Sequence, residues 1–253
     1  MSARWRTAVV WLAALATMAI TARLGVWQLD RAAQKTALHE ARLKVANAAP
    51  LTARELPETP VEAQAAEHRV AHVQGRWLPT ATRYLDNRPM SGRAGFHVLT
   101  PLALDDGRVL LVQRGWWPRD VADRTRIGAP PPPEGQVGVR GRVALAPSRL
   151  FELAPEAGGP IRQNLDLDAF ARESRLPLLP WVLVQLEDPS QPVGDGLLRQ
   201  WPEPASDVHK HYGYAAQWFA LATLVGGLLL WFQVWRPRRA RPRAAQPTSP
   251  LNR

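Results

Sequence analysis

The chain has 253 residues, no cysteine, and 32 basic against 22 acidic side chains, which gives a formal net charge of +10. The absence of cysteine excludes disulfide bonds, thiolate metal sites and a cysteine nucleophile. Eight of the ten net charges lie in residues 1–7 and 236–253, where arginines occur without any acid. The body of the chain is close to neutral, so we do not expect the basic folded face that nucleic-acid binding requires.

Residues 8–28 form the first of two long apolar stretches, and we expect them to be a transmembrane helix. Residues 7–22 carry no charge, and the apolar character continues to Trp27 if the Arg23 side chain extends toward the lipid headgroups. About 20 apolar residues suffice for a helix to cross the hydrocarbon core of a bilayer. A cleaved signal peptide is the alternative, because a basic start precedes the stretch, but no clear A-x-A cleavage motif follows it.

Residues 214–235 form the second stretch, which has no charge, carries aromatic residues at both ends, and is followed by an arginine cluster. A buried helix of a soluble domain is the alternative, but such helices rarely stay apolar on all sides for six turns. Basic flanks remain on the cytoplasmic side of a membrane. We therefore expect a hairpin of two spans with residues 1–7 in the cytoplasm, residues 29–213 in the periplasm, and residues 236–253 as a disordered, basic cytoplasmic tail. A bacterial inner membrane is expected, because seven residues before the first span leave no room for a mitochondrial presequence.

The expected periplasmic part is a mostly antiparallel β-domain with a helical N-terminal segment. The predicted fold class is therefore a membrane protein in which two helices flank an α+β extracytoplasmic domain. Residues 29–49 are rich in helix formers, and residues 166–174 predict one amphipathic helix. Asp105-Asp106-Gly107 predicts a hairpin turn. Short runs rich in Val, Leu and aromatic residues predict strands at 69–77, 83–87, 96–104, 108–116, 137–145, 161–164 and 181–187.

The sequence contains no motif of a standard enzyme. It lacks a G-x-S-x-G nucleophile turn, a glycine loop for phosphate and an H-E-x-x-H metal motif. The paired acids Asp105-Asp106 and Glu187-Asp188 lie at turn positions, which is typical of solvated loop residues. We therefore expect no enzymatic activity.

Two of the six histidines, His209 and His211, directly precede the second apolar stretch. If residue 211 is helical, Ala215 and Trp218 share its face, so its imidazole lies over an apolar surface at the membrane interface. Such a position suits an axial ligand to a lipophilic macrocycle such as haem. From the local sequence alone, a histidine that only anchors the helix among the headgroups is the favoured interpretation.

Several segments carry a family resemblance when they are taken in order. They are Leu24-Gly25-Val26-Trp27-Gln28 with Arg31 and Lys35, Gly75-Arg76-Trp77, Thr100-Pro101-Leu102, Arg114-Gly115-Trp116-Trp117, and His211-Tyr212-Gly213-Tyr214 with Trp218-Phe219. Together they resemble the Surfeit locus protein family, which are membrane-anchored assembly factors for haem–copper cytochrome c oxidase. The resemblance covers most of the chain. Gln113 and Lys210 depart from it, because the family usually has asparagine at both positions.

The resemblance implies a role in oxidase biogenesis, in which haem A is bound transiently while it is placed in the catalytic subunit. His211 is the implied ligand of the haem iron, because the steps of three residues to Tyr214 and seven to Trp218 fit His211 and not His209. Tyr214 and Trp218 would line the macrocycle. Lys210 places a cation beside the implied ligand, which would lower the proton affinity of the imidazole.

The resemblance also implies that Trp27, Gln28 and Arg31 on the first span help to hold the haem. Arg31 or Arg23 would pair with a propionate, since guanidinium suits carboxylates, although lipid-headgroup anchoring explains Arg31 equally well. The implied partners are the oxidase catalytic subunit, haem A synthase and membrane lipid. A haem-free scaffold that holds oxidase subunits is the main alternative, and an envelope sensor is disfavoured because the 18-residue tail is too short for an output domain.

Overall fold

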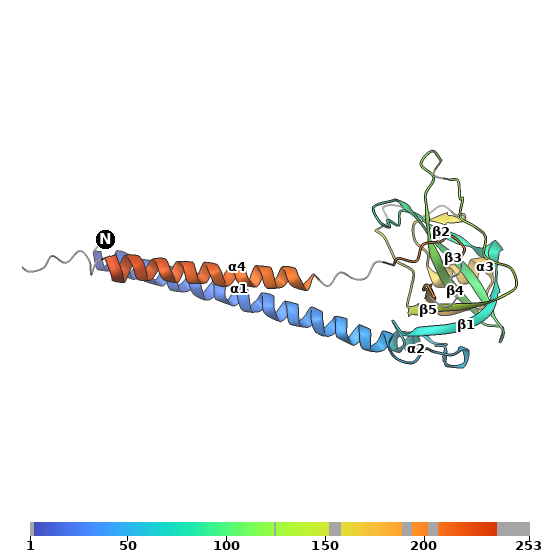
Figure 1. Cartoon of the computed structure of the whole chain (residues 1–253), viewed down its shortest axis with the longest axis horizontal. Coiled ribbons are helices and arrows are strands. Elements are labelled where there is room, and N and C mark those ends of the chain that lie inside the picture. Colours follow the sequence, from blue (N-terminus) through green and yellow to red (C-terminus); the bar gives the residue numbers. More distant parts are fainter. Residues whose placement is uncertain (1–2, 124, 152–157, 189–193, 202–206, 237–253) are drawn as a thin grey trace, which may run out of the picture. The chain divides into compact units, whose positions relative to one another are not determined.

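A computed structural model describes residues 3–123, 125–151, 158–188, 194–201 and 207–236 (Figure 1). The chain divides into two compact units. The helical unit comprises Met1–Glu40 and Ala205–Arg253, and the sheet unit comprises Ala41–Pro204. The predicted tail at 236–253 lies, apart from Arg236, outside the described residues.

The helical unit consists of α1 (Ala3–Ala46) and α4 (Val208–Leu230), and the latter continues into a short π-helix, η3 (Trp231–Trp235). Both helices are long and apolar enough to cross a membrane, over Arg4–Ala46 and Val208–Trp235. The two predicted apolar helices are thus confirmed as helices. The second begins six residues before the predicted span, and the position of the membrane along it stays a prediction.

The two helices run antiparallel, side by side (Figure 1), and meet along one stripe of each. Small residues allow this approach: a Cβ atom on Gly25 would lie 2.7 Å from the ring of Phe219, and one on Gly226 would lie 3.0 Å from Met18. Small residues at such interfaces let helix backbones come close together in membranes. Buried or half-buried residues recur at steps of three and four along both helices. On α1 they are Ala14, Met18, Thr21, Gly25, Gln28 and Ala32, and on α4 they are His211, Ala215, Trp218, Ala222, Gly226 and Leu229. We call this stripe the seam.

The sheet unit is built on one seven-stranded sheet that closes on itself. Neighbouring strands follow the order β1 (Val70–Trp77), β5 (Gln136–Ala144), β7 (Leu178–Gln185), β4 (Val109–Pro118) and β3 (Gly95–Leu104), with β2 (Arg83–Leu85) and β6 (Ile161–Arg162) beyond β3. An additional antiparallel pairing of β1 with β3 closes the first five strands into a barrel. Among the strand pairs of the described residues, only β4–β7 and β2–β6 are parallel. The predicted strands and their mostly antiparallel arrangement are confirmed.

One strand begins three residues earlier than predicted. The predicted strand starts at Trp181, whereas β7 starts at Leu178 and contains Pro180. Proline lacks the N–H group of a regular ladder and is found in sheets at edges or irregularities. Here the register against β4 shifts between the pairs Val109↔Leu178 and Leu111↔Val182, and this irregularity contains Pro180.

Two apolar cores lie on the two faces of the barrel wall. Leu110, Val112 and Trp181 belong to the interior cluster. Leu111 belongs to a second cluster, in which the sheet packs against α3 (Leu167–Ser174) through Phe170. Strands β3 and β4 are therefore buried on both faces. The predicted helix at 166–174 is confirmed, and Asp166 caps it by accepting a hydrogen bond from the Ala169 N–H at 2.9 Å.

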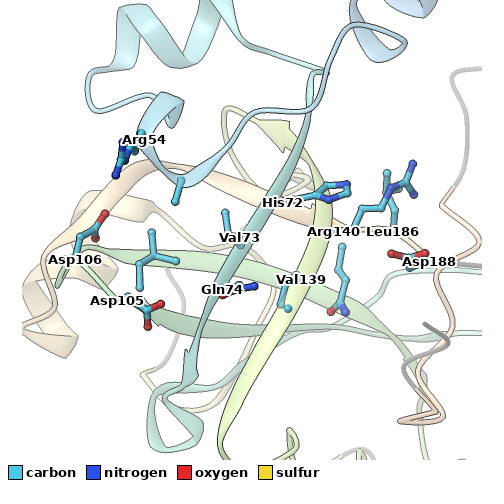
Figure 2. Close-up of a pocket in the computed structure, with 14 residues that line it drawn as sticks. Arg54, His72, Val73, Gln74, Asp105, Asp106, Val139, Arg140, Leu186 and Asp188 are labelled. Carbon is cyan, nitrogen blue, oxygen red and sulfur yellow. The ribbon is translucent and has the colours of Figure 1, made fainter. Parts of the chain in front are cut away.

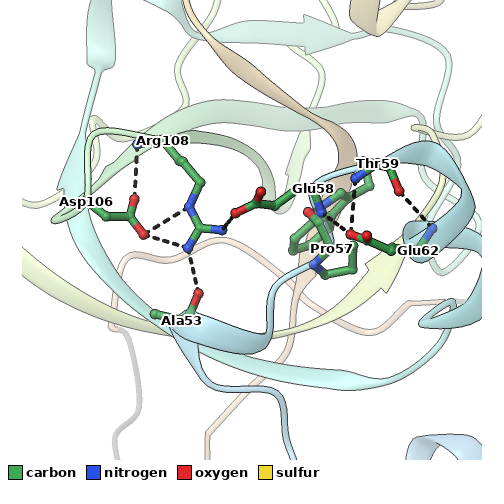
Figure 3. Close-up of polar contacts among 8 residues, drawn as sticks. Ala53, Pro57, Glu58, Thr59, Glu62, Asp106 and Arg108 are labelled. Carbon is green, nitrogen blue, oxygen red and sulfur yellow. Dashed lines mark hydrogen bonds and ion pairs between the residues drawn. The ribbon is translucent and has the colours of Figure 1, made fainter.

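The segment after α1 is fixed to the barrel by polar contacts (Figure 3). It contains η1 (Ala53–Glu55) and α2 (Pro60–Ala65), short helices that the sequence pattern does not predict. Arg108, which follows the β3–β4 turn, bonds to the Ala53 carbonyl at 2.6 Å and to the Glu58 carboxylate at 3.0 Å. Arg108 also binds Asp106, and its hydrogen bond holds the pKa of that carboxyl below its usual value. These contacts join the segment after α1 to the β3–β4 hairpin.

Candidate functional site

The most specific polar contact of the helical unit joins His211 on α4 to Gln28 on α1. The Nδ1 atom of His211 lies 2.7 Å from Oε1 of Gln28, and both side chains are partly buried in the seam. An amide oxygen can only accept a hydrogen bond, so Nδ1 carries the proton. In the neutral form of this ring, the lone pair is then on Nε2. A fixed tautomer and ring orientation of this kind is what outer-shell partners give to metal-binding histidines.

Helical spacing explains why these two residues meet. Gln28 lies three residues after Gly25, and His211 lies four residues before the buried Ala215, so both belong to the seam. The missing side chain at Gly25 lets α4 approach closely one turn away from the contact. The structure also places Trp218, half-buried, on the His211 face of α4.

The other predicted site residues flank the seam. Trp27 and Tyr214 are 53% and 52% exposed. Arg31 is exposed, and its Nη1 donates to Oε1 of Gln34 at 2.9 Å on the same helix. Arg31 and Tyr214 each follow a seam residue by three positions, so in an antiparallel pair they border the same side of the seam. Trp27 lies one helical turn before Arg31 on that side. Trp27, Arg31 and Tyr214 together form an exposed surface, apolar and cationic, beside the imidazole.

The structure separates the two neighbouring histidines. His209 is exposed and lies off the seam, whereas His211 lies on it. Between them, Lys210 forms an ion pair with Asp207 at 3.0 Å. This hydrogen bond and the charges of Lys210, Lys35 and His211 lower the pKa of Asp207. The cation next to His211 is thus accompanied by a carboxylate.

The sheet unit offers a groove of about 770 Å³ across β1 and β5. Figure 2 shows Asp105 and Asp106 toward one end of it and Arg140 and Asp188 toward the other. Asp106 is bound by Arg108, and Asp105 accepts a hydrogen bond from Gln136 at 3.0 Å. Among the residues that the structure describes, no group of three or more His, Asp or Glu side chains could hold a metal ion.

His97 is a strongly perturbed titratable group of the sheet unit, but its surroundings indicate packing. It is 8% exposed, its ring meets Trp201 edge to face, and Nδ1 lies 3.4 Å from the Ser148 hydroxyl. Burial, helped by the charge of Arg88, lowers its pKa to about 3. A ring that stays neutral and is enclosed in this way has no access to a ligand.

Arg114 and its partners form a buried ionic cluster that the sequence analysis missed. Arg114 and Arg199 both bind one carboxylate oxygen of Asp195. In the sequence, Arg114-Gly115-Trp116-Trp117 is one of the segments that carry the family resemblance. Its partner Asp195 lies 81 residues away, and no local pattern connects positions at that separation.

Known proteins are similar to this one over most of the chain. The model of the SURF1 family matches residues 15–223, which include α1 from the middle of its apolar stretch, the whole sheet unit and most of α4. A SURF1-like protein of Rickettsia bellii is 26% identical over 214 residues, which cover 83% of this chain and 85% of that protein. A SURF1-like protein of Rickettsia felis is 33% identical over 109 residues, which cover 42% of this chain and 45% of that protein. The chain belongs to the SURF1 family.

Proposed function

We propose that this protein is a non-enzymatic assembly factor for haem–copper cytochrome c oxidase that binds haem A transiently and helps to insert it into the catalytic subunit. Membership of the SURF1 family supports the general role. The observation that carries the haem proposal is the contact of His211 with Gln28, which orients the imidazole in the seam. Haem A is the cargo in this proposal.

The residues around His211 fit such a cargo. Nε2 of His211 is the atom left to bind iron, because Nδ1 donates to Gln28. The exposed rings of Trp27 and Tyr214 supply apolar surface for a macrocycle on one side of the seam. Arg31 on the same side provides a guanidinium for a propionate carboxylate. Its Nη1 donates a hydrogen bond to Gln34 on the same exposed face of α1.

The proposed location is a bacterial inner membrane, crossed by α1 and α4. Arginines flank the two apolar segments at their outer ends, at positions 4 and 6 and from Arg236 onward. Basic flanks favour the cytoplasmic side, so both termini would be cytoplasmic and the sheet unit periplasmic. His211, in the first turns of α4, would then lie at the periplasmic surface of the membrane.

The proposed partners follow from the cargo. The oxidase catalytic subunit would receive haem A, and haem A synthase would supply it, because the chain shows no motif for making haem A itself. Membrane lipid would surround the helical unit. The near-neutral charge of the chain outside its two basic ends argues against a nucleic-acid partner.

The test is an absorption spectrum of the protein purified in detergent from a host that makes haem A. Wild type and His209→Ala should carry haem, whereas His211→Ala should lose it, because only His211 is held in the seam. If wild type carries no haem, the haem-free scaffold replaces the haem-binding function. If His211→Ala keeps all of its haem with normal oxidase assembly, His211 is not the ligand. A deletion that leaves oxidase haem content and activity normal would refute both functions.

A further inference from the structure

The groove across β1 and β5, which we call the β1–β5 groove, is lined by a buried polar side chain that lacks a partner. Gln185, the last residue of β7, lines the groove and is only 3% exposed. Its Oε1 atom accepts no hydrogen bond from any residue that the structure describes. Buried polar atoms of folded proteins are paired with few exceptions. An unpaired acceptor at a groove therefore indicates a donor that comes from outside the chain.

The floor of the β1–β5 groove is formed by two paired strands. His72 on β1 lies opposite Arg140 on β5, and Gln74 lies opposite Gly138. Directly opposite residues have their side chains on the same face of a sheet, so both pairs belong to the groove side. A Cβ atom on Gly138 would meet nothing within 4 Å, so β5 is open at this position. A site with such a floor exists before a ligand binds.

The free polar groups of the groove are mainly hydrogen-bond donors. Arg54 and His72 have no hydrogen-bond or ion-pair partner among the described residues. Arg140 donates from Nη1 to the Glu187 carbonyl at 3.1 Å, which leaves other N–H groups of its guanidinium for a ligand. Figure 2 shows Arg54 at the end of the groove that holds Asp106, with His72 and Arg140 toward the other end. Free donors thus occur toward both ends.

The acids of the groove are already engaged. Arg108 binds Asp106, and their hydrogen bond holds the pKa of that carboxyl below its usual value. Asp105 accepts a hydrogen bond from Gln136 at 3.0 Å, and Asp188 has a contact of its own. These carboxylates balance the charges of the arginines in and beside the groove, so net charge does not select a ligand. The free donors do, because guanidinium groups suit carboxylates.

Two requirements define the class of ligand. The donors of Arg54, His72 and Arg140 need acceptors toward both ends of the groove, whereas Oε1 of Gln185 needs a donor. An extended peptide with acidic side chains meets both requirements, because each of its residues also carries a backbone N–H group. A compact carboxylate would reach only one end. The groove volume of about 770 Å³ lies within the range of roughly 300–1,000 Å³ that is typical of ligand sites.

We propose that the β1–β5 groove binds an extended acidic segment of a partner polypeptide. In this complex Gln185 accepts a hydrogen bond from a backbone N–H group of the segment, and Arg140 with His72 binds a carboxylate. The inference goes beyond the proposed haem function and does not depend on it, because all of these residues belong to the sheet unit. It assigns the sheet unit a binding role of its own.

The experiment uses the full-length protein in detergent. A phage-displayed library of random short peptides is selected on wild type, and Kd of the most enriched peptide is measured by fluorescence anisotropy at low and high salt. The test variants are Gly138→Tyr, which fills the groove, Arg140→Gln, and Gln185→Leu, which removes the unpaired acceptor. Gly158→Tyr is the control for the first, because a Cβ atom there also meets nothing within 4 Å. Arg76→Gln is the control for the second, because Arg76 is exposed on β1 outside the groove.

We expect the enriched peptides to be rich in aspartate and glutamate and to bind more weakly at high salt. Gly138→Tyr should abolish binding. Arg140→Gln should raise Kd by roughly 10-fold to 100-fold, as loss of a charge-assisted hydrogen bond implies. Gln185→Leu should raise Kd by about fivefold but should not lower the thermal midpoint, because it removes an unpaired buried acceptor. Both controls should bind the peptide as wild type does.

The proposal is wrong if no peptide is enriched, if the enriched peptides have no excess of acidic residues, or if they bind Gly138→Tyr as tightly as wild type. If Gly138→Tyr does not fold, an unchanged Kd in Arg140→Gln overturns the proposal. Free glutamate that competes as well as the peptide would show a site for a small carboxylate instead. An unchanged Kd in Gln185→Leu would overturn the contact with Gln185. Haem content enters none of these outcomes, so the proposed function stands or falls separately.

Discussion

His97 should make the stability of the sheet unit depend on pH. Its pKa is about 3 in the folded protein against an ordinary value of 6.5. Burial is the main cause, and Arg88 is the charged group that faces it and adds to the effect. Because the folded pKa is depressed, the unfolded chain binds a proton that the folded protein cannot accept. Stability is therefore complete above pH 6.5 and falls as the pH decreases toward 3.

The size of the effect follows from the two pKa values. At pH 5.5 the unfolded state gains about 1.4 kcal/mol from protonation of this one residue, and at pH 4.5 about 2.7 kcal/mol. His68, which is partly buried, also has a lowered pKa and adds a loss of the same sign. The comparison therefore requires a variant of His97 itself.

The assay is urea unfolding of the full-length protein in detergent, followed by the fluorescence of the buried Trp116 and Trp181 at pH 7.5 and 5.5. Wild type should lose about 1.4 kcal/mol more between these pH values than His97→Gln, which cannot be protonated. The exposed His72→Gln serves as the control and should behave as wild type. An equal loss in wild type and His97→Gln would refute the buried, neutral state of His97.

Three further predictions concern the seam and the fold. Gln28→Leu removes the acceptor for His211 and should lower haem affinity by roughly 10-fold to 100-fold. Gln64→Leu, at an exposed position of α2 in the sheet unit, should leave a haem titration unchanged; equal affinities of Gln28→Leu and wild type would remove Gln28 from the site. The side chain of Gly25→Leu should collide with the ring of Phe219 and lower both the thermal midpoint and the haem content. Gly227→Leu should change neither quantity, because nothing lies within 4 Å of its Cβ position. Asp166→Ala removes the N-cap of α3 and should cost about 1 kcal/mol in urea unfolding, and a change near zero would show that the cap contributes nothing.

Much of the fold follows from local patterns in the sequence. The strands of the barrel are apolar runs between Gly, Pro and Asp, and the turn at Asp106-Gly107 joins β3 to β4 as its residues indicate. The two long helices follow from uninterrupted apolar stretches. The pairing of β1 with β3 that closes the barrel could not be predicted, because it joins Gly75 to Leu104 without any local signal.

The candidate site, too, could be predicted only in part from the sequence. Spacing alone puts His211, Ala215 and Trp218 on one face of a helix, and the family resemblance adds Gln28. The distance of 2.7 Å between Oε1 of Gln28 and Nδ1 of His211 depends on how α1 and α4 align. Small residues such as Gly25 permit this alignment, but they do not predict it. The distant pairing of Arg114 with Asp195 is likewise a property of the folded barrel.

The central claim is that His211 binds the iron of haem A, and one measurement tests it most directly. The absorption spectrum of His211→Ala, purified from a haem A-producing host, is recorded before and after imidazole is added. We expect the haem bands of wild type to be absent or weak in the variant, and imidazole with added haem A to restore them by replacing the missing ring. A variant that keeps the wild-type bands without imidazole would contradict the claim.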